Sequence, residues 1–111
     1  MKKLVIDLCV GLGGLSSAFH DDLDWEVVTV DIDPKFKPTI IADIRYLPLR
    51  DGIQPDVLLM APPCERFSVA CHTWPKMGIS QAMWIVGACL EAVARLKPIF
   101  WLLENPMGRL R

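Results

Sequence analysis

The stretch LVIDLCVGLGGLSSAF, residues 4–19, joins a short apolar run to a glycine-rich turn and then to a segment with helical character. A short apolar run of this kind is typical of a strand that is covered on both faces. Glycines after such a strand let the backbone turn sharply and approach a ligand at the start of the next helix. The stretch therefore predicts the first strand-turn-helix unit of an α/β fold.

The alternation of apolar runs with polar or helical segments continues along the chain. Further runs are WEVVTVDI (25–32), TIIADI (39–44), DVLLMA (56–61) and IFWLLEN (99–105). Strands that alternate with helices form sheets with right-handed crossovers between parallel neighbours. We therefore predict an α/β fold with a doubly wound, mostly parallel sheet of about five strands, in one domain that spans residues 1–111.

Two segments between the apolar runs predict helices. Residues 15–23 have room for about two helical turns. Residues 79–97 give the clearest helix, because apolar residues recur at three- and four-residue steps and Pro98 ends the pattern. The links after the second and third runs are short and contain prolines, so full helices are not expected there. The expected apolar positions of the long helix are Met83, Val86, Leu90, Val93 and Leu96.

Composition and charge argue against several classes of protein. The 111 residues are 52% hydrophobic with a net charge of −1, so no strong overall field attracts nucleic acid or an anionic membrane. No apolar run reaches the roughly 18 residues that span a bilayer, and no secretion signal is recognisable before Asp7. The four cysteines have irregular spacing, which indicates a reducing, cytoplasmic compartment and matches no metal-binding pattern. We expect neither a membrane partner nor a metal ion.

Chemically active residues gather where the predicted strands end. In open parallel sheets, ligands bind beyond the carboxyl ends of the strands. A purely structural sheet does not need acids and a thiol at these ends, so the pattern indicates a ligand site or an active site. The residues concerned are Asp7, Cys9, Asp31, Asp33, Asp43, Cys64 and Glu104.

The glycine-rich turn allows a nicotinamide dinucleotide as the ligand. Gly11 and Gly13 match the first two glycines of G-x-G-x-x-G, although Ser16 occupies the third position. Asp31 follows Gly11 by 20 residues, where an acid that binds ribose hydroxyls is expected. Asp7 argues against this alternative, because its carboxylate would lie close to a pyrophosphate.

A cofactor with a positively charged end agrees better with the acids. S-adenosylmethionine carries an ammonium, a sulfonium, a ribose and an adenine. Asp7 suits the ammonium end, Asp31 suits the ribose diol, and Asp43 can accept a hydrogen bond from the adenine amino group. Ile32 and Ile44 are expected to flank the adenine ring.

Cys64 follows two prolines at the end of the fourth apolar run, within APPCERFS (61–68). Cysteines in cytosolic proteins are often inert core residues. A thiol at a strand end is, however, suited to adding to C6 of cytosine, which makes C5 nucleophilic enough to accept a methyl group. This addition needs an acid near N3, and Glu104 at the end of the fifth run is placed for that role.

Five motifs resemble those of the DNA (cytosine-5) methyltransferase family, in particular its compact versions encoded by phages. DLCVGLGGLSSAF resembles the first motif, VDIDP the second, ADI the third, PPCERFS the Pro-Cys nucleophile motif and ENP the Glu-Asn-Val motif. They follow one another in the family's order, from Leu4 to Pro106. The resemblance implies a Rossmann-like class I methyltransferase fold, S-adenosyl-L-methionine as cofactor and DNA as substrate. RNA remains open, because the same cysteine chemistry acts on either nucleic acid.

The resemblance also implies roles for individual residues. Cys64 is the implied nucleophile, and Glu104 contacts N3 and the amino group of the flipped cytosine. Pro63 shapes the nucleophile loop, while Arg66 and Ser68 are candidate contacts to phosphates or base edges. The implied cofactor residues are Asp7, Gly11 and Gly13 at the methionine end, and Asp31, Ile32, Asp43 and Ile44 at the ribose and adenine.

The sequence departs from the family pattern in ways that bear on function. Cys9 stands where the family usually has a phenylalanine against the adenine, which implies looser cofactor binding. The family's arginine motif, target-recognition region and final strands have no counterpart before Arg111. The run IFWLLEN would then form a sheet edge that is apolar on both faces, so we expect self-association or a partner chain that completes the sheet.

The leading prediction is methyl transfer from S-adenosyl-L-methionine to C5 of cytosine in DNA through a covalent Cys64 adduct. The first alternative is an inactive or split S-adenosylmethionine-binding module that needs a partner chain. A further alternative is an NAD-dependent Rossmann oxidoreductase.

Overall fold

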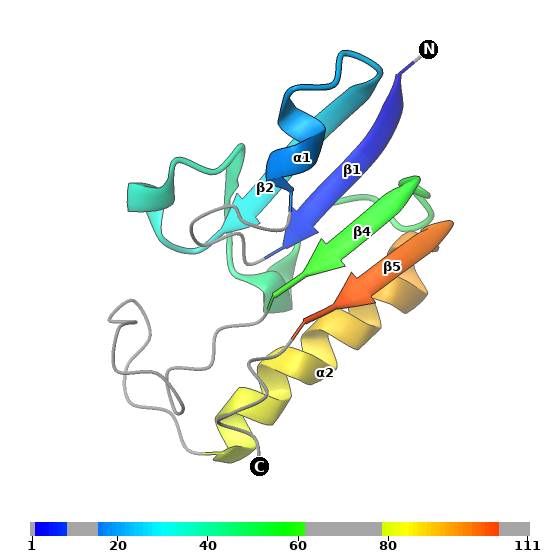
Figure 1. The fold of residues 1–111 in the computed structure, drawn as a ribbon. Helices are drawn as coiled ribbons and strands as arrows, with labels where there is room; N and C mark the ends of the chain where they lie inside the picture. The colour runs from blue at the N-terminus through cyan, green and yellow to red at the C-terminus, as the bar shows by residue number, and fades with distance from the viewer. Residues whose placement is uncertain (1, 9–15, 62–78, 105–111) are drawn as a thin grey trace.

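The computed structural model describes residues 2–8, 16–61 and 79–104, with only the backbone given for residues 79–83. These residues contain a five-stranded sheet in the order β3-β2-β1-β4-β5, and every neighbouring pair is parallel (Figure 1). The predicted α/β fold with a parallel sheet is therefore confirmed. The strands are β1 (Lys3–Leu8), β2 (Trp25–Asp31), β3 (Ile40–Ile41), β4 (Val57–Met60) and β5 (Phe100–Leu103).

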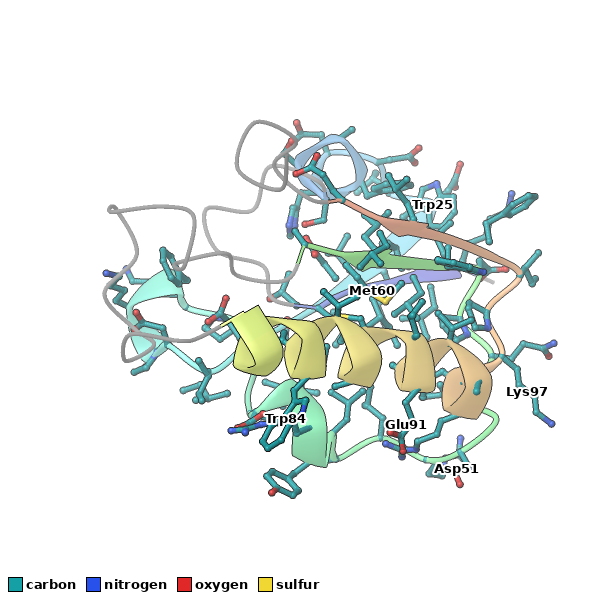
Figure 2. The ribbon with its side chains drawn as sticks, turned by 90° about the horizontal axis from the view of Figure 1, so that it is seen from below. Trp25, Asp51, Met60, Trp84, Glu91 and Lys97 are labelled. Carbon is teal, nitrogen blue, oxygen red and sulfur yellow. The ribbon has the colours of Figure 1, made fainter. Side chains whose placement is uncertain are left out.

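Helical segments lie on both faces of the sheet. The long helix α2 (Ile79–Leu96) covers one face and α1 (Ser17–His20) lies on the other (Figures 1 and 2). The links on either side of β3 contain only the short 3-10 turns η1 (Pro34–Phe36) and η2 (Ile44–Tyr46). The prediction of the long helix is confirmed. The prediction that the links on either side of β3 contain no full helix is also confirmed, since the structure describes both links.

The prediction of about two turns for the first helix is wrong, because α1 has only four residues. Directly after it, the backbone N–H of Asp22 donates to the carbonyl of Phe19, and the Asp22 carboxylate accepts from the backbone N–H of Asp24. The Phe19 ring packs edge-on against Trp25, the first residue of β2, with 4.8 Å between the ring centroids. The chain therefore turns early and returns into the sheet.

The core lies between the sheet and α2. Side chains alternate along a strand, so Ile6 and Leu8 of β1 enter this core while Asp7 points to the opposite face. Met60 of β4 lies between the sheet and α2 (Figure 2). Complete burial of a large aliphatic side chain stabilises a fold by about 1.5–3 kcal/mol, so this layer supplies much of the stability. Among the residues of α2 from 84 onward, whose side chains the structure describes, the buried ones are Ile85, Cys89, Ala92 and Leu96.

The buried face of α2 agrees in part with the predicted apolar positions. Leu96 is buried and Val93 packs against the core, whereas Leu90 is 46% exposed. The described part of α2 is apolar around much of its circumference, so spacing alone does not fix the direction that faces the sheet. The small residues Cys89 and Ala92 lie on the buried face, where they allow the helix to approach the strands closely.

The C-terminal end of α2 is held by the loop that precedes β4. The backbone N–H of Gly52 donates to the carbonyl of Arg95, and the N–H of Gln54 donates to the carbonyl of Leu96, both at 2.7 Å. Lys97 then leaves the helix with φ of 53°, a left-handed conformation that is common after a helix end. These bonds satisfy carbonyls that an α-helix leaves without an internal partner.

β5 forms one edge of the sheet and is poorly covered. Phe100 is 71% exposed and Leu102 is 52% exposed, and Trp101 and Ile99 are also exposed. The strand contains no charged residue that would discourage pairing with another strand. The predicted position of this run at a sheet edge is confirmed for the described sheet.

Candidate active site

Four of the predicted acids lie along the carboxyl edge of the sheet. Asp43 follows β3, Asp31 ends β2, Asp7 is the penultimate residue of β1 and Glu104 follows β5. The backbone N–H of Glu104 donates to the carbonyl of Met60 at 2.8 Å, which places Glu104 beside the end of β4. Glu104 itself is exposed. The parallel register therefore brings to one edge acids that are far apart in the sequence.

Asp7 is the most unusual of these acids, because its side chain is 1% exposed. Neither of its carboxylate oxygens has a hydrogen-bond partner among the residues that the structure describes. Burial raises the pKa of Asp7 to about 6 from an ordinary 3.8. A buried carboxylate without a partner is costly, and such groups often mark functional sites.

Ser16 and Asp31 contribute to the environment of Asp7. The buried Ser16 hydroxyl likewise lacks a hydrogen-bond partner within the described segments. Ser16 lies near enough to Asp7 to lower the pKa of the carboxyl somewhat, although the two groups do not have the geometry of a hydrogen bond. The charge of Asp31 raises the pKa of Asp7 slightly, which is expected from the shared face of neighbouring strands. The surroundings therefore suit a cationic or hydrogen-bond-donating ligand.

Asp31 is fixed at the end of β2 by the turn that follows. Its side chain accepts a hydrogen bond from the backbone N–H of Asp33 at 2.8 Å, and the residue is 8% exposed. The connection between β2 and β3 is also held by two reciprocal hydrogen bonds between Thr29 and Thr39. The N–H of Thr29 donates to the Thr39 hydroxyl at 3.0 Å, and the N–H of Thr39 donates to the Thr29 hydroxyl at 2.8 Å.

Asp43 and its neighbours present a different arrangement from the one expected. Asp43 caps the start of η2 and forms an ion pair with Arg45. The hydrogen bond from Arg45 holds the pKa of the Asp43 carboxyl below its usual value. Ile44 packs into the core and is only 6% exposed, so its side chain does not offer a face to a ligand, contrary to the expectation that it flanks adenine. Ile32 is half-buried at the edge and retains that expectation.

The remaining predicted site residues lie outside the described residues. They include the proposed nucleophile, so the structure gives no distance between a thiol and Glu104. These residues are Cys9, Gly11, Gly13, Pro63, Cys64, Arg66 and Ser68.

Two residues of this edge were not assigned a role from the sequence. Ser16 enters the sequence analysis only as a departure from a glycine pattern, and Arg45 has no role in it. The sequence does contain a pattern that points to Arg45. In both Asp33-Pro34-Lys35 and Asp43-Ile44-Arg45, a basic residue follows by two positions an aspartate that caps a 3-10 turn. The same pattern after two strands could be found by inspecting the sequence.

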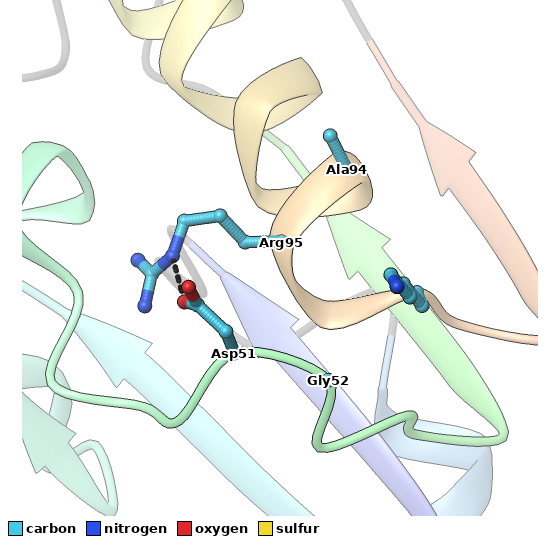
Figure 3. A pocket seen from close by; sticks show the side chains of 5 residues that line it. Asp51, Gly52, Ala94 and Arg95 are labelled. Atoms are coloured by element: carbon cyan, nitrogen blue, oxygen red, sulfur yellow. Dashed lines mark hydrogen bonds and ion pairs between the residues drawn. The ribbon is translucent and has the colours of Figure 1, made fainter.

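A shallow pocket lies at the opposite, amino edge of the sheet. It is lined by Asp51, Gly52, Ala94, Arg95 and Lys97 and has a volume of about 390 Å³. Arg95 donates from Nε to Asp51 at 2.7 Å across this pocket (Figure 3). Ligands of open parallel sheets bind beyond the carboxyl ends of the strands, so this pocket is not our candidate cofactor site.

No helix in the described part of the chain is both long and apolar enough to cross a membrane.

Comparison with known proteins supports the interpretation of this edge. The model of the C-5 cytosine-specific DNA methylase family matches residues 4–108. No curated protein matches the chain. A solved structure of a proposed S-adenosyl-L-methionine-dependent methyltransferase from Methanococcus maripaludis is similar in fold, with a TM-score of 0.57 and 16% sequence identity.

The alignment with that structure covers 97% of this chain and 50% of the other, so the chain spans about half the length of the solved protein. At 16% identity this likeness shows the shared fold alone. The family match is stronger evidence for the identity of the chain, since the matched residues include the five strands, the glycine-rich turn and the Pro-Cys segment. The chain belongs to the C-5 cytosine-specific DNA methylase family, and this membership implies S-adenosyl-L-methionine as its cofactor.

Proposed function

We propose that the chain binds S-adenosyl-L-methionine at the carboxyl edge of the sheet and transfers the methyl group to C5 of cytosine in DNA through a covalent Cys64 adduct. The observation that carries this proposal is the family match over residues 4–108, which includes both Cys64 and Glu104. Family membership does not favour the NAD-dependent alternative.

The described residues agree with the charge of this cofactor. The buried Asp7 carboxylate lacks a partner among the described residues, and a ligand ammonium would supply one. Asp31 is fixed at the neighbouring strand end, and its carboxylate is an acceptor of the kind that suits ribose hydroxyls. Two carboxylates on one face repel each other, so a cationic ligand between them would be favourable.

The proposed chemistry assigns one task to each reactive residue. The bound cofactor supplies a methyl group on an electrophilic sulfonium. Cys64, as the thiolate, adds to C6 of the cytosine, and a proton held at N3 by Glu104 prevents the build-up of negative charge on the ring. C5 becomes nucleophilic and accepts the methyl group, whose bond to the sulfonium sulfur would break to leave S-adenosyl-L-homocysteine. Loss of the C5 proton to a base then allows the Cys64 sulfur to leave C6, which restores the aromatic ring and the free thiolate.

The substrate must present an unstacked base to these residues. Enzymes that act on a base inside a duplex extrude the target nucleotide into the active site. Arg66 and Ser68 follow Cys64 closely in sequence and are the proposed contacts to phosphates or base edges. The exposed apolar edge of β5 supports a further proposal, that a strand from a second copy or another chain pairs with it.

Covalent trapping tests the reaction. DNA that contains 5-fluorocytosine cannot lose a proton from C5, so the adduct with Cys64 persists and is detected on a denaturing gel. We expect an adduct that requires S-adenosyl-L-methionine and is abolished in Cys64→Ser. A pool of random duplexes removes the need to know the target sequence, and matching RNA tests the other nucleic acid.

Cofactor binding without any adduct would contradict the proposed transfer and support the alternative, a binding module that needs a partner chain. Cys89→Ser is a matched control, because Cys89 is buried in the core and far in sequence from Cys64. Its trapping yield should resemble that of the unmodified chain if the variant is folded.

A further inference from the structure

We propose that Ser16 is a positioning residue, whose hydroxyl donates to the ionised Asp7 carboxylate when the amino-acid end of the cofactor is bound and so holds Asp7 in place for the ligand ammonium. This inference rests on the proposed function, in which Asp7 meets that ammonium. It extends the function to a buried residue that has no assigned role in the site.

Two buried polar side chains lie near each other at the end of β1 without a hydrogen bond between them. Asp7 is 1% exposed and Ser16 is 0% exposed. Neither carboxylate oxygen of Asp7 nor the hydroxyl oxygen of Ser16 has a partner among the residues that the structure describes. Buried polar groups are almost always hydrogen-bonded, so each exception calls for an explanation. A single explanation covers both residues if their hydrogen bonds form when a ligand is present.

The pKa of Asp7 reports the proximity of the two residues. Both the hydroxyl and the backbone N–H of Ser16 lower the pKa of the Asp7 carboxyl, although burial outweighs them and the net shift is upward. A donor lowers the pKa of a carboxyl because it stabilises the ionised form. Ser16 therefore favours the carboxylate, which is the form that a ligand ammonium also favours.

The place of Ser16 in the fold gives its hydroxyl no other partner. Ser16 directly precedes α1, where a serine side chain commonly accepts a hydrogen bond from a backbone N–H of the first turn, but here the side chain makes no such bond. The Ser16 carbonyl accepts from the backbone N–H of Phe19 at 2.9 Å, which anchors the backbone of Ser16. The hydroxyl turns about a single side-chain torsion, so it can donate to Asp7 without a change in the backbone.

The Asp7 carboxylate has capacity for both contacts. An ionised carboxylate offers about four acceptor sites on its two oxygens, and the described residues use none of those on Asp7. One oxygen can accept from the ligand ammonium and the other from the Ser16 hydroxyl. Without the second bond, one oxygen of a buried charge would remain without a partner, which lowers the affinity for the ligand.

Two other charged groups act on Asp7, and neither takes the place of Ser16. His20 lowers the pKa of Asp7 and Asp31 raises it, in both cases through charge and not through a hydrogen bond. Asp31 accepts a hydrogen bond from the backbone N–H of Asp33 at 2.8 Å. Both groups stay unchanged in the variants below, so their effects cancel in the comparison.

A double-mutant cycle tests the proposal. The proteins are the unmodified chain, Ser16→Ala, Asp7→Asn and the double variant, with Ser17→Ala as the matched control because Ser17 is adjacent and exposed. The ligands are S-adenosyl-L-homocysteine and 5′-methylthioadenosine, which lacks the amino-acid end. Isothermal calorimetry at pH 8, where Asp7 is ionised, measures both affinities. Urea unfolding at pH 5, where Asp7 is largely protonated, measures the stability of the ligand-free chain.

We expect Ser16→Ala to weaken binding of S-adenosyl-L-homocysteine by about tenfold, because a hydrogen bond to a charged group corresponds to roughly ten- to hundredfold in affinity. In the Asp7→Asn background the same substitution should cost only about threefold, since a bond to a neutral acceptor is roughly half as strong. Binding of 5′-methylthioadenosine should not change in Ser16→Ala, and Ser17→Ala should not change the affinity for either ligand.

The stability of Ser16→Ala separates positioning from a merely structural role. The substitution should not lower the urea midpoint of the ligand-free chain, because the hydroxyl that it removes has no partner there among the described residues. A lower midpoint together with weaker binding of both ligands would show a structural role and overturn the inference.

Failures in binding have different meanings. If Ser16→Ala weakens S-adenosyl-L-homocysteine equally in both backgrounds, or leaves its affinity unchanged, Ser16 does not act through Asp7 and only this inference is overturned. If the unmodified chain binds neither ligand, the proposed cofactor function fails and the inference fails with it.

Discussion

The buried Asp7 carboxylate lowers the stability of the fold by a measurable amount when it is ionised. Burial raises its pKa from 3.8 to about 6, so in the native state the group retains its proton over a pH range in which the unfolded chain has already lost it. The native state therefore binds more protons than the unfolded state between about pH 4 and pH 6. Stability falls as pH rises through this window and does not change further above it on account of Asp7.

The size of the effect follows from the shift. One pKa unit corresponds to about 1.4 kcal/mol, so a rise of roughly two units costs about 3 kcal/mol once Asp7 is ionised. Asp7→Asn removes the ionisation and keeps the shape of the side chain. Relative to the unmodified chain, the variant should gain about 3 kcal/mol in unfolding free energy between pH 4 and pH 8.

Urea unfolding at several pH values, at one fixed protein concentration, measures this difference. Asp24→Asn is the matched control, because Asp24 is exposed and carries the same substitution. If the unmodified chain and Asp7→Asn give parallel curves of stability against pH, the Asp7 carboxylate has a partner or solvent contact that the structure does not show. The reasoning from its burial would then be refuted.

Two further predictions concern the ligand and the sheet edge. A ligand ammonium beside Asp7 favours the ionised carboxylate, so binding of S-adenosyl-L-homocysteine should release up to about half a proton at pH 6 and almost none at pH 8. Calorimetry in buffers of different ionisation enthalpy measures this proton release. Equal release in Asp7→Asn would contradict a contact between the ammonium and Asp7. Trp101→Lys places a charge on the exposed edge strand and should reduce association of the chain, as measured by light scattering over a range of concentrations. Leu23→Lys, at an exposed position away from β5, serves as its control, and an unmodified chain that stays monomeric throughout would contradict self-association.

The arrangement of strands was predictable because apolar runs in a parallel sheet are short and separated by clear turn signals. The start and end of β2, for example, lie within one residue of the run WEVVTVDI. α2 was equally clear from its length and from Pro98, but its buried face was predicted only in part. Leu90 and Leu96 are both apolar and only Leu96 is buried, because packing against the sheet distinguishes them. The length of α1 depends on the contact between Phe19 and Trp25, which spacing does not reveal.

In the candidate site, too, some features were predictable from the sequence and others were not. The positions of Asp7, Asp31, Asp43 and Glu104 at one edge follow from strand ends and parallel topology, and the sequence therefore predicts them. The direction of a side chain depends on alternation and on local turns, which is why Ile44 enters the core although it lies beside Asp43. The ion pair of Arg45 depends on the 3-10 turn η2, whose geometry aligns the two side chains.

The bonds between α2 and the loop before β4 have a consequence for engineering this chain. Residues 50–54 form a mostly exposed turn of the kind that usually tolerates insertions, tags and new termini. Here two amides of the turn, those of Gly52 and Gln54, cap the last carbonyls of α2, so an insertion between them would uncap a helix that is distant in sequence. The turn between α1 and β2, where Leu23 is exposed, is a better place for a reporter or a new chain end.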